Sequence, residues 1–263
     1  MVSKYKFKSI IVGLSVITVC VLLALISSSF SIFIQQQSNS ATKTVGNSTG
    51  TTAIKTTPTP TPTTFSTPQP LFFDNFADTS KGWSLSSVSG YTRSIDNNTL
   101  TLADANHKIL TESLPTNTIY NDFMITVSFT LLQANNDDSV GLYVRGDSNL
   151  DHDYRIDIFG DSSYAISKEF LDANNALQAK ALVSQTKTTA LHPVGLQNNV
   201  TVAMKGSVLI LQINGSLINS IVDTDYTTGQ IALFVQNSNS SSGVEASFSS
   251  VAVYPAPHQL PSN

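Results

Sequence analysis

The stretch Leu209-Ile-Leu-Gln-Ile-Asn-Gly-Ser-Leu-Ile-Asn-Ser-Ile-Val222 is the clearest indication of the fold of this chain. Two apolar runs, Leu209–Ile213 and Leu217–Val222, flank the dipeptide Asn214-Gly215. Asn-Gly is preferred in two-residue hairpin turns because both turn positions need a positive φ, which Asn and Gly tolerate. The stretch therefore predicts two antiparallel strands joined by a tight turn.

The same β pattern extends over residues 71–254, where apolar side chains recur at every second position. In Phe123–Phe129, for example, apolar Phe, Ile, Val and Phe alternate with Met, Thr and Ser. Clusters of Asn, Asp, Gly and Ser separate about a dozen such runs, as expected for turns. One segment, Leu171–Val183, fits a helix or equally a loop between strands. The pattern predicts an all-β fold, an antiparallel β-sandwich of the jelly-roll type.

The N-terminal part of the chain has the composition of a membrane anchor. Ile10–Ile34 is an apolar run of 25 residues without a charged side chain, and Lys4, Lys6 and Lys8 precede it. At about 1.5 Å per residue, this run spans a hydrocarbon core of about 30 Å. The lysines are expected to stay cytoplasmic. We therefore predict a single-pass protein of the cell membrane whose C-terminal part is extracellular; a cleaved signal peptide is the alternative, although its apolar region is typically shorter.

Composition divides the chain into five parts. We predict a short basic cytoplasmic tail (residues 1–9), a transmembrane signal-anchor helix (10–34), a Thr/Ser/Pro-rich disordered linker (35–70), a β-sandwich domain (71–256) and a flexible tail (257–263). Thr, Ser and Pro fill 21 of the 36 linker positions, a composition that cannot bury enough apolar surface to fold. The single cysteine, Cys20, lies in the predicted anchor, so the outer domain has neither disulfides nor thiolate metal ligands.

Several short motifs occur in a familiar order within the predicted domain. Phe72-Phe73-Asp74-Asn75-Phe76 and Gly82-Trp83 open it, Asn214-Gly215 and Gly229-Gln230-Ile231-Ala232-Leu233 follow, and Phe248 to Tyr254 closes it. In this order the motifs resemble the concanavalin A-like lectin/glucanase jelly rolls, in particular the laminin-G-like and 3-keto-disaccharide-hydrolase-like branch. The resemblance covers roughly Leu71–Tyr254. Because it rests on core and turn residues, it implies the fold rather than an activity. Trp83 is interpreted as a core residue.

The sequence contains no recognisable catalytic motif. The β-glucanases of this fold carry Glu-x-Asp-x-x-Glu on one strand, whereas the three glutamates here, Glu112, Glu169 and Glu245, lie on different segments. Asp151, Asp153 and Asp157 alternate, but Asp151 and Asp153 are expected in a turn, as solvated carboxylates. We therefore predict no catalytic residue, no metal ligand and no cofactor, and a domain that is not an enzyme. Ca²⁺ stays as an alternative because aspartates gather in the predicted turns.

The charge balance excludes nucleic acid as a partner. Residues 71–263 contain 18 acidic residues and 9 Lys or Arg, a formal charge of −9. Such a domain repels phosphate backbones.

A candidate binding surface lies on two neighbouring strands. If Val140–Arg145 and Tyr154–Phe159 form a hairpin, Tyr143 and Arg145 from one and Arg155 and Asp157 from the other converge on a concave sheet. Sugar-binding sites use this mixture, with aromatic faces for the C–H side of the ring and Arg or Asp for hydroxyl pairs. The alternative is that the arginines merely pair with nearby aspartates across the strands.

The sequence therefore predicts a membrane-anchored module that recognises a glycan or another cell-envelope polymer without cleaving it. A glycosidase resembling the 3-keto-disaccharide hydrolases, with Asp157 and Glu169 as its acids, is one alternative. A structural or protein-interaction module without a small ligand is the other. Because the cytoplasmic tail is so short, any signal would need a protein partner in the membrane.

Overall fold

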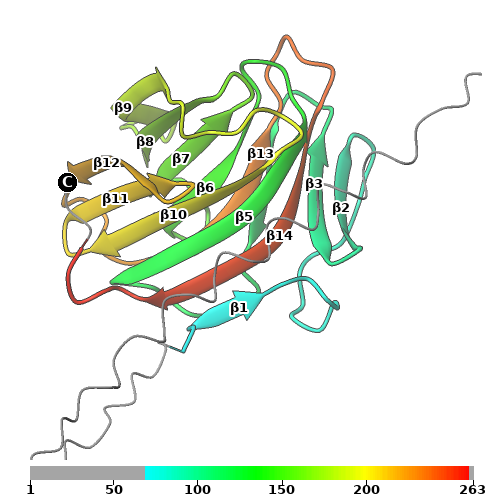
Figure 1. Ribbon diagram of the computed structural model, residues 1–263. Helices are drawn as coiled ribbons and strands as arrows, with labels where there is room; N and C mark the ends of the chain where they lie inside the picture. Colours follow the sequence, from blue (N-terminus) through cyan, green and yellow to red (C-terminus); the bar gives the residue numbers. More distant parts are fainter. Residues whose placement is uncertain (1–68, 261–263) are drawn as a thin grey trace, which may run out of the picture. The chain divides into compact units, whose positions relative to one another are not determined.

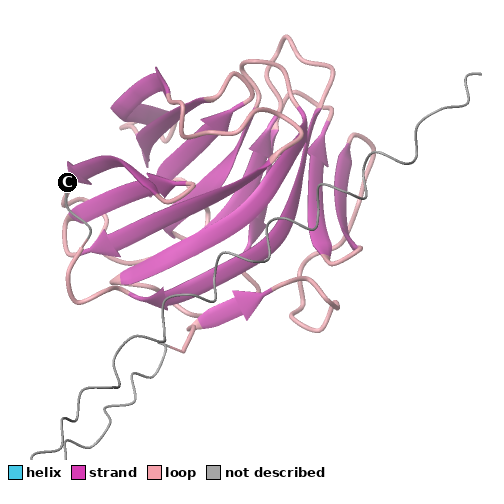
Figure 2. Cartoon of the chain, in the orientation of Figure 1, coloured by secondary structure: helices cyan, strands magenta, loops and turns pink. Residues whose placement is uncertain are grey.

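The computed structural model describes residues 69–260, and Figure 1 shows their arrangement. The predicted cytoplasmic tail (residues 1–9), the predicted anchor (10–34), nearly all of the linker and the last three residues lie outside this range. Among residues 69–260, no helix is long and apolar enough to cross a membrane. These residues form fourteen strands joined by loops and turns (Figure 2).

The strands form two antiparallel sheets. The larger contains, in spatial order, β12 (Ser216–Val222), β11 (Val208–Ile213), β10 (Gln197–Lys205), β5 (Phe123–Gln133), β14 (Val244–Pro255), β3 (Thr99–Asp104) and β2 (Tyr91–Asp96), with β1 (Phe72–Asp74) also paired to β14. The smaller contains β4 (Ile109–Ser113), β13 (Gln230–Gln236), β6 (Ser139–Gly146), β7 (Asp153–Phe159), β8 (Ser163–Leu171) and β9 (Leu177–Lys187). The predicted all-β antiparallel sandwich is thus confirmed for the described residues.

Alternate residues of the strands fill the space between the sheets and form one continuous apolar core. On β5, for example, Phe123, Ile125 and Val127 are at most 1% exposed. Trp83 lies in the same core against Phe72, and its indole N–H donates to the Asp74 carboxylate at 2.6 Å. The interpretation of Trp83 as a core residue is therefore confirmed.

The hairpin predicted at Asn214-Gly215 joins β11 to β12. Both turn residues have a positive φ, 50° and 82°. The side chain of Asn214 holds the turn against its surroundings: its amide donates to the Ala190 carbonyl at 2.7 Å, and its oxygen accepts from the Asn199 amide at 2.8 Å. The turn therefore has the positive φ angles that the Asn-Gly sequence predicts.

The helix predicted as one possibility for Leu171–Val183 is wrong, because most of this segment is strand. Strand β8 ends at Leu171, the Asp172 carboxylate accepts from the backbone of Asn174 and Ala176 in a tight turn, and β9 begins at Leu177. Because β9 is an edge strand with mostly exposed side chains, packing does not require apolar residues at every second position. Its Ala, Leu, Gln and Lys residues consequently have the composition of a helix surface.

Candidate functional site

Polar side chains gather on the outer face of the six-stranded sheet, the face turned away from the core. Successive residues of a strand point to opposite faces, so the register determines which residues share this face. Tyr143 of β6 lies opposite Arg155 of β7, which lies opposite Ser167 of β8. In the next row, Gly141, Asp157 and Ala165 are aligned in the same way. Three of the four residues predicted for a binding surface, Tyr143, Arg155 and Asp157, are therefore brought together.

Arg155 is the centre of this group. Its guanidinium carbon lies 4.6 Å from the ring centre of Phe234 and 5.8 Å from that of Tyr143. Its Nε and Nη2 donate to Asp157 Oδ1 at 3.2 and 2.6 Å, and its Nη1 donates to Glu169 Oε1 at 3.3 Å. Nη2 also donates to the side-chain oxygen of Gln236. These six residues, hereafter the Arg155 cluster, are Tyr143, Arg155, Asp157, Glu169, Phe234 and Gln236.

Glycine at position 141 makes room for the aromatic base of the cluster. Phe234 of β13 lies opposite Gly141 of β6, and a Cβ at this glycine would come within 2.7 Å of the Phe234 ring. The Tyr143 and Phe234 rings contact each other with centres 4.9 Å apart. The local sequence Gly141-Leu142-Tyr143 therefore fits the ring beneath the guanidinium.

Burial controls the electrostatics of the cluster. Burial disfavours the charged form of Arg155, but the charge of Asp157 and the hydrogen bonds to it outweigh this and raise the pKa of Arg155. Burial also raises the pKa of Glu169, against the opposing effect of Arg155. Among the described residues, Asp157 Oδ2 and Glu169 Oε2 have no hydrogen-bond donor, so each carboxylate keeps an acceptor oxygen.

Asp153, predicted to be a solvated turn residue, is fully buried. It is the first residue of β7, lies opposite Glu169, and is 0% exposed. Neither of its carboxylate oxygens has a hydrogen-bond partner among the described residues. Burial, together with the nearby charge of Glu169, raises the pKa of Asp153 to about 8. The prediction was wrong because β7 begins one residue earlier than the turn composition suggested.

Arg145, the fourth predicted binding residue, does not join the cluster. It is the extra residue of a β-bulge, since Gln230 pairs with Gly146 and Ile231 with Val144. With a φ of 53°, its side chain leaves the alternation of β6 and is 1% exposed. The guanidinium donates to the carbonyls of Asn121, Gly206 and Tyr226, at 2.8 to 3.2 Å. Arg145 therefore ties loops together at one end of the sandwich.

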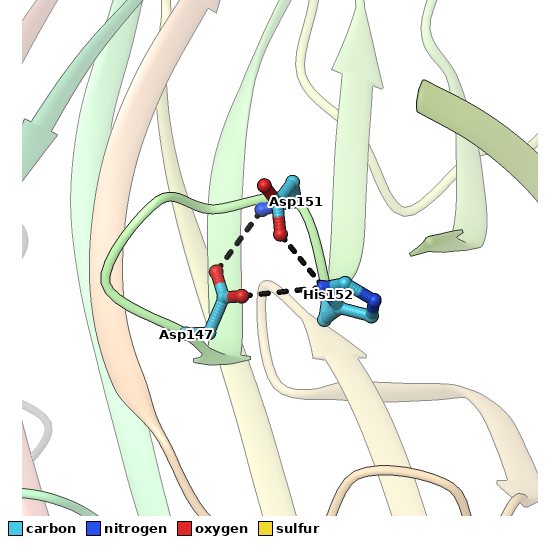
Figure 3. A group of neighbouring side chains, drawn as sticks. All are labelled: Asp147, Asp151 and His152. Atoms are coloured by element: carbon cyan, nitrogen blue, oxygen red, sulfur yellow. Dashed lines mark hydrogen bonds and ion pairs between the residues drawn. The ribbon is translucent and has the colours of Figure 1, made fainter. Parts of the chain in front are cut away.

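The loop between β6 and β7 contains two carboxylates and a histidine that point toward one another (Figure 3). His152 Nδ1 lies 2.6 Å from Asp151 Oδ1 and 3.2 Å from Asp147 Oδ2. The hydrogen bond to Asp151 is the main reason that the pKa of His152 is raised above its ordinary value. One ligand atom from each residue lies within 4.8 Å of the others, and two carboxylates with an imidazole are a donor set that suits a divalent transition-metal ion. The side chains of Asp147, Asp151 and His152 are 39%, 23% and 41% exposed, and exposed acidic groups are common without an ion, so we assign no metal to this group.

The arrangement contains one residue that the sequence reasoning proposed only for catalysis and three that it missed. Glu169, an acid of the glycosidase alternative, lies beside Asp157 on the same guanidinium. Asp153, Phe234 and Gln236 were missed. The alternation Asp153, Arg155, Asp157 in the sequence was a signal for the first of them, whereas the other two come from β13 and depend on strand order.

Solved structures with this fold include carbohydrate-binding proteins and glucanases. Carbohydrate-binding module CBM66 from Bacillus subtilis has a TM-score of 0.50 at 15% identity, covering 66% of this chain and 96% of its own. A Bacillus subtilis protein of unknown function with a galectin-like fold has a TM-score of 0.53 at 13% identity, covering 72% and 97%. A glycoside hydrolase family 16 endo-glucanase from Bacteroides ovatus has a TM-score of 0.52 at 10% identity, covering 70% and 99%.

At such identities these structures establish the fold alone. No curated protein matches the chain. A family model, however, matches residues 67–253, which are most of the sequence and nearly all of the β-sandwich. On this match, the chain belongs to the family of the 3-keto-alpha-glucoside-1,2-lyase-like domain.

Proposed function

We propose that this protein recognises a glycan of the cell envelope without cleaving it, and that the Arg155 cluster is the binding site. In this proposal the apolar run Ile10–Ile34 anchors the protein in the membrane and the β-sandwich lies outside the cell. The observation that carries the proposal is the organised polar cluster on the outer face of a sheet. Core packing does not require an arginine, two carboxylates and two aromatic rings there.

The cluster offers acceptor oxygens for hydroxyl groups and an open part of the sheet beside them. Asp157 and Glu169 each hold Arg155 through one oxygen, which leaves the other oxygen as an acceptor for hydroxyl groups. Beside them, β8 and β9 present small side chains, with Ser167 opposite Ala181 and Glu169 opposite Ala179. Both alanines are exposed, so a ring can approach the carboxylates across this part of the sheet. The fold shared with a carbohydrate-binding module supports the same proposal.

A glycan array probed with the full-length protein in detergent tests the proposal. We expect binding to one class of glycan, and at least about a tenfold loss of affinity in Asp157→Asn and Glu169→Gln, since each removes a charged acceptor worth about 1.5–3 kcal/mol. Glu245→Gln is the matched control, because Glu245 lies on β14 in the other sheet. An array without any bound glycan, or equal losses in all three variants, would contradict the proposal.

Catalysis by the same cluster is the second candidate, and one observation favours it. The family is named for a lyase acting on 3-keto-glucosides, and such a reaction needs a general base to remove a proton. Asp157 and Glu169 are carboxylates beside a fixed guanidinium, and the pKa of Glu169 is raised by burial. Turnover of a 3-keto-disaccharide by the full-length protein, lost in both variants and kept in Glu245→Gln, would favour this candidate over binding alone.

A further inference from the structure

The Arg155 guanidinium donates four of its five N–H groups to its own neighbours. Nε and Nη2 donate to Asp157, Nη1 donates to Glu169, and Nη2 also donates to Gln236. Arginine recognises a ligand carboxylate or phosphate by presenting two parallel N–H groups to it. Here only one N–H group, on Nη1, has no acceptor among the described residues, so a pair of parallel N–H groups is not offered to a ligand.

The groups that remain are acceptors with negative charge. Asp157 and Glu169 each keep one carboxylate oxygen that has no donor among the described residues. Two cations on the same strands as cluster residues, Arg145 of β6 and Lys168 of β8, do not offset this charge. Arg145 is turned to the end of the sandwich, and Lys168 lies on the opposite face, bound to Asp223 and Asp225.

We propose that the site selects neutral sugars, whose hydroxyls donate to Asp157 and Glu169, and rejects polymers that carry carboxylate, sulfate or phosphate groups. This inference rests on the proposed glycan-binding function and names its ligand class. The formal charge of −9 over residues 71–263 acts in the same direction, because it repels polyanions before contact. Uronic-acid polymers and phosphate-rich wall polymers are thereby excluded as ligands.

Polymer pairs with one backbone and different charge test the inference. Suitable pairs are hydroxyethyl cellulose with carboxymethyl cellulose, dextran with dextran sulfate, and a β-1,3-glucan with its carboxymethyl derivative, each measured by biolayer interferometry on the full-length protein in detergent. For the backbone that binds, we expect affinity for the anionic member to be at least about tenfold weaker at low salt. Added salt should narrow this difference by screening the charges.

Charge variants identify the source of the selectivity. In Glu169→Gln the ratio between neutral and anionic affinity should fall, while Glu245→Gln should keep the wild-type ratio. Equal or tighter binding of the anionic member would overturn the inference and leave the proposed function standing. If the protein bound none of the polymers and no glycan on the array, both the inference and the proposed function would fall.

Discussion

Arg155 is the residue on which the charge balance of the outer sheet face depends. Its side chain is 10% exposed, and its partners Asp157 and Glu169 are 7% and 6% exposed. Breaking this buried ion-pair group should strongly lower the free energy of unfolding, because removing the cation leaves two carboxylates close together with little water. The same residue therefore matters for stability and for the proposed site.

We predict that Arg155→Met lowers the free energy of unfolding by about 3–5 kcal/mol, the usual cost of breaking a buried ion pair. Urea denaturation followed by tryptophan fluorescence measures it, since Trp83 is buried in the core. Lys187→Met is the control, because Lys187 is 77% exposed and lies 3.7 Å from Asp161. Adding Asp157→Asn and Glu169→Gln to Arg155→Met should restore part of the stability. A loss below about 1 kcal/mol would show that the cluster is well hydrated.

Asp153 should make the stability of the domain depend on pH. Its pKa is about 8 in the folded protein and about 3.9 in an unfolded chain, so the folded state holds the proton between these values. Stability contributed by the protonated group is therefore lost as pH rises from about 4 to about 8, by at most about 1.4 kcal/mol per pH unit. In Asp153→Asn this loss should be absent, so the variant gains stability relative to wild type as pH increases. A difference that stays constant with pH would contradict the burial of a protonated Asp153.

Among the elements, the β11–β12 hairpin was predictable and the β6–β13 bulge was not. Asn214-Gly215 encodes its turn locally, because the two residues themselves supply the positive φ values. The bulge at Arg145 has no local sequence signal: it depends on how β13 pairs with β6, which places Gln230 opposite Gly146 and Ile231 opposite Val144 and leaves Arg145 as the extra residue. Strict alternation therefore placed Tyr143 correctly and Arg145 on the wrong face. Likewise, the alternation within its own strand predicts the sheet face of Asp157. The position of Phe234 beside Tyr143 could be predicted only with knowledge of the strand order.

We predict that Gly215→Ala destabilises the hairpin by about 1 kcal/mol, because its φ of 82° is unfavourable for a residue with a Cβ. Nothing lies within 4 Å of the added methyl group, so the cost should come from the backbone alone. Thermal unfolding of the variant measures it, with Ser216→Ala, an exposed neighbour, as the control. Equal melting temperatures for the two variants would mean that the turn relaxes to another conformation.

At the scale of the whole molecule, the acidic residues are confined to the part of the chain after residue 70. All 18 acidic residues lie after residue 70, whereas five of the 14 lysines and arginines precede it. The β-sandwich is stabilised by its apolar core and by buried polar groups such as Asp74 and Arg155, without any cysteine in residues 69–260. A domain of this kind needs no oxidising environment to fold. Its stability is therefore compatible with either side of a membrane, and the N-terminal sequence has to determine the location.

The proposed location follows from Lys4, Lys6 and Lys8 before the apolar run, and it predicts how the full-length chain is inserted. We expect the chain to stay in the membrane fraction after a high-salt wash, and protease added to intact spheroplasts to cleave the β-sandwich from the outside. Replacing the three lysines by glutamate should reduce the outward orientation, because the positive charges hold the tail inside. The matched control replaces Lys43 and Lys55, which lie beyond the apolar run, by glutamate. A soluble product beginning after the apolar run would instead establish a cleaved signal peptide, and the glycan site would then act on a released protein.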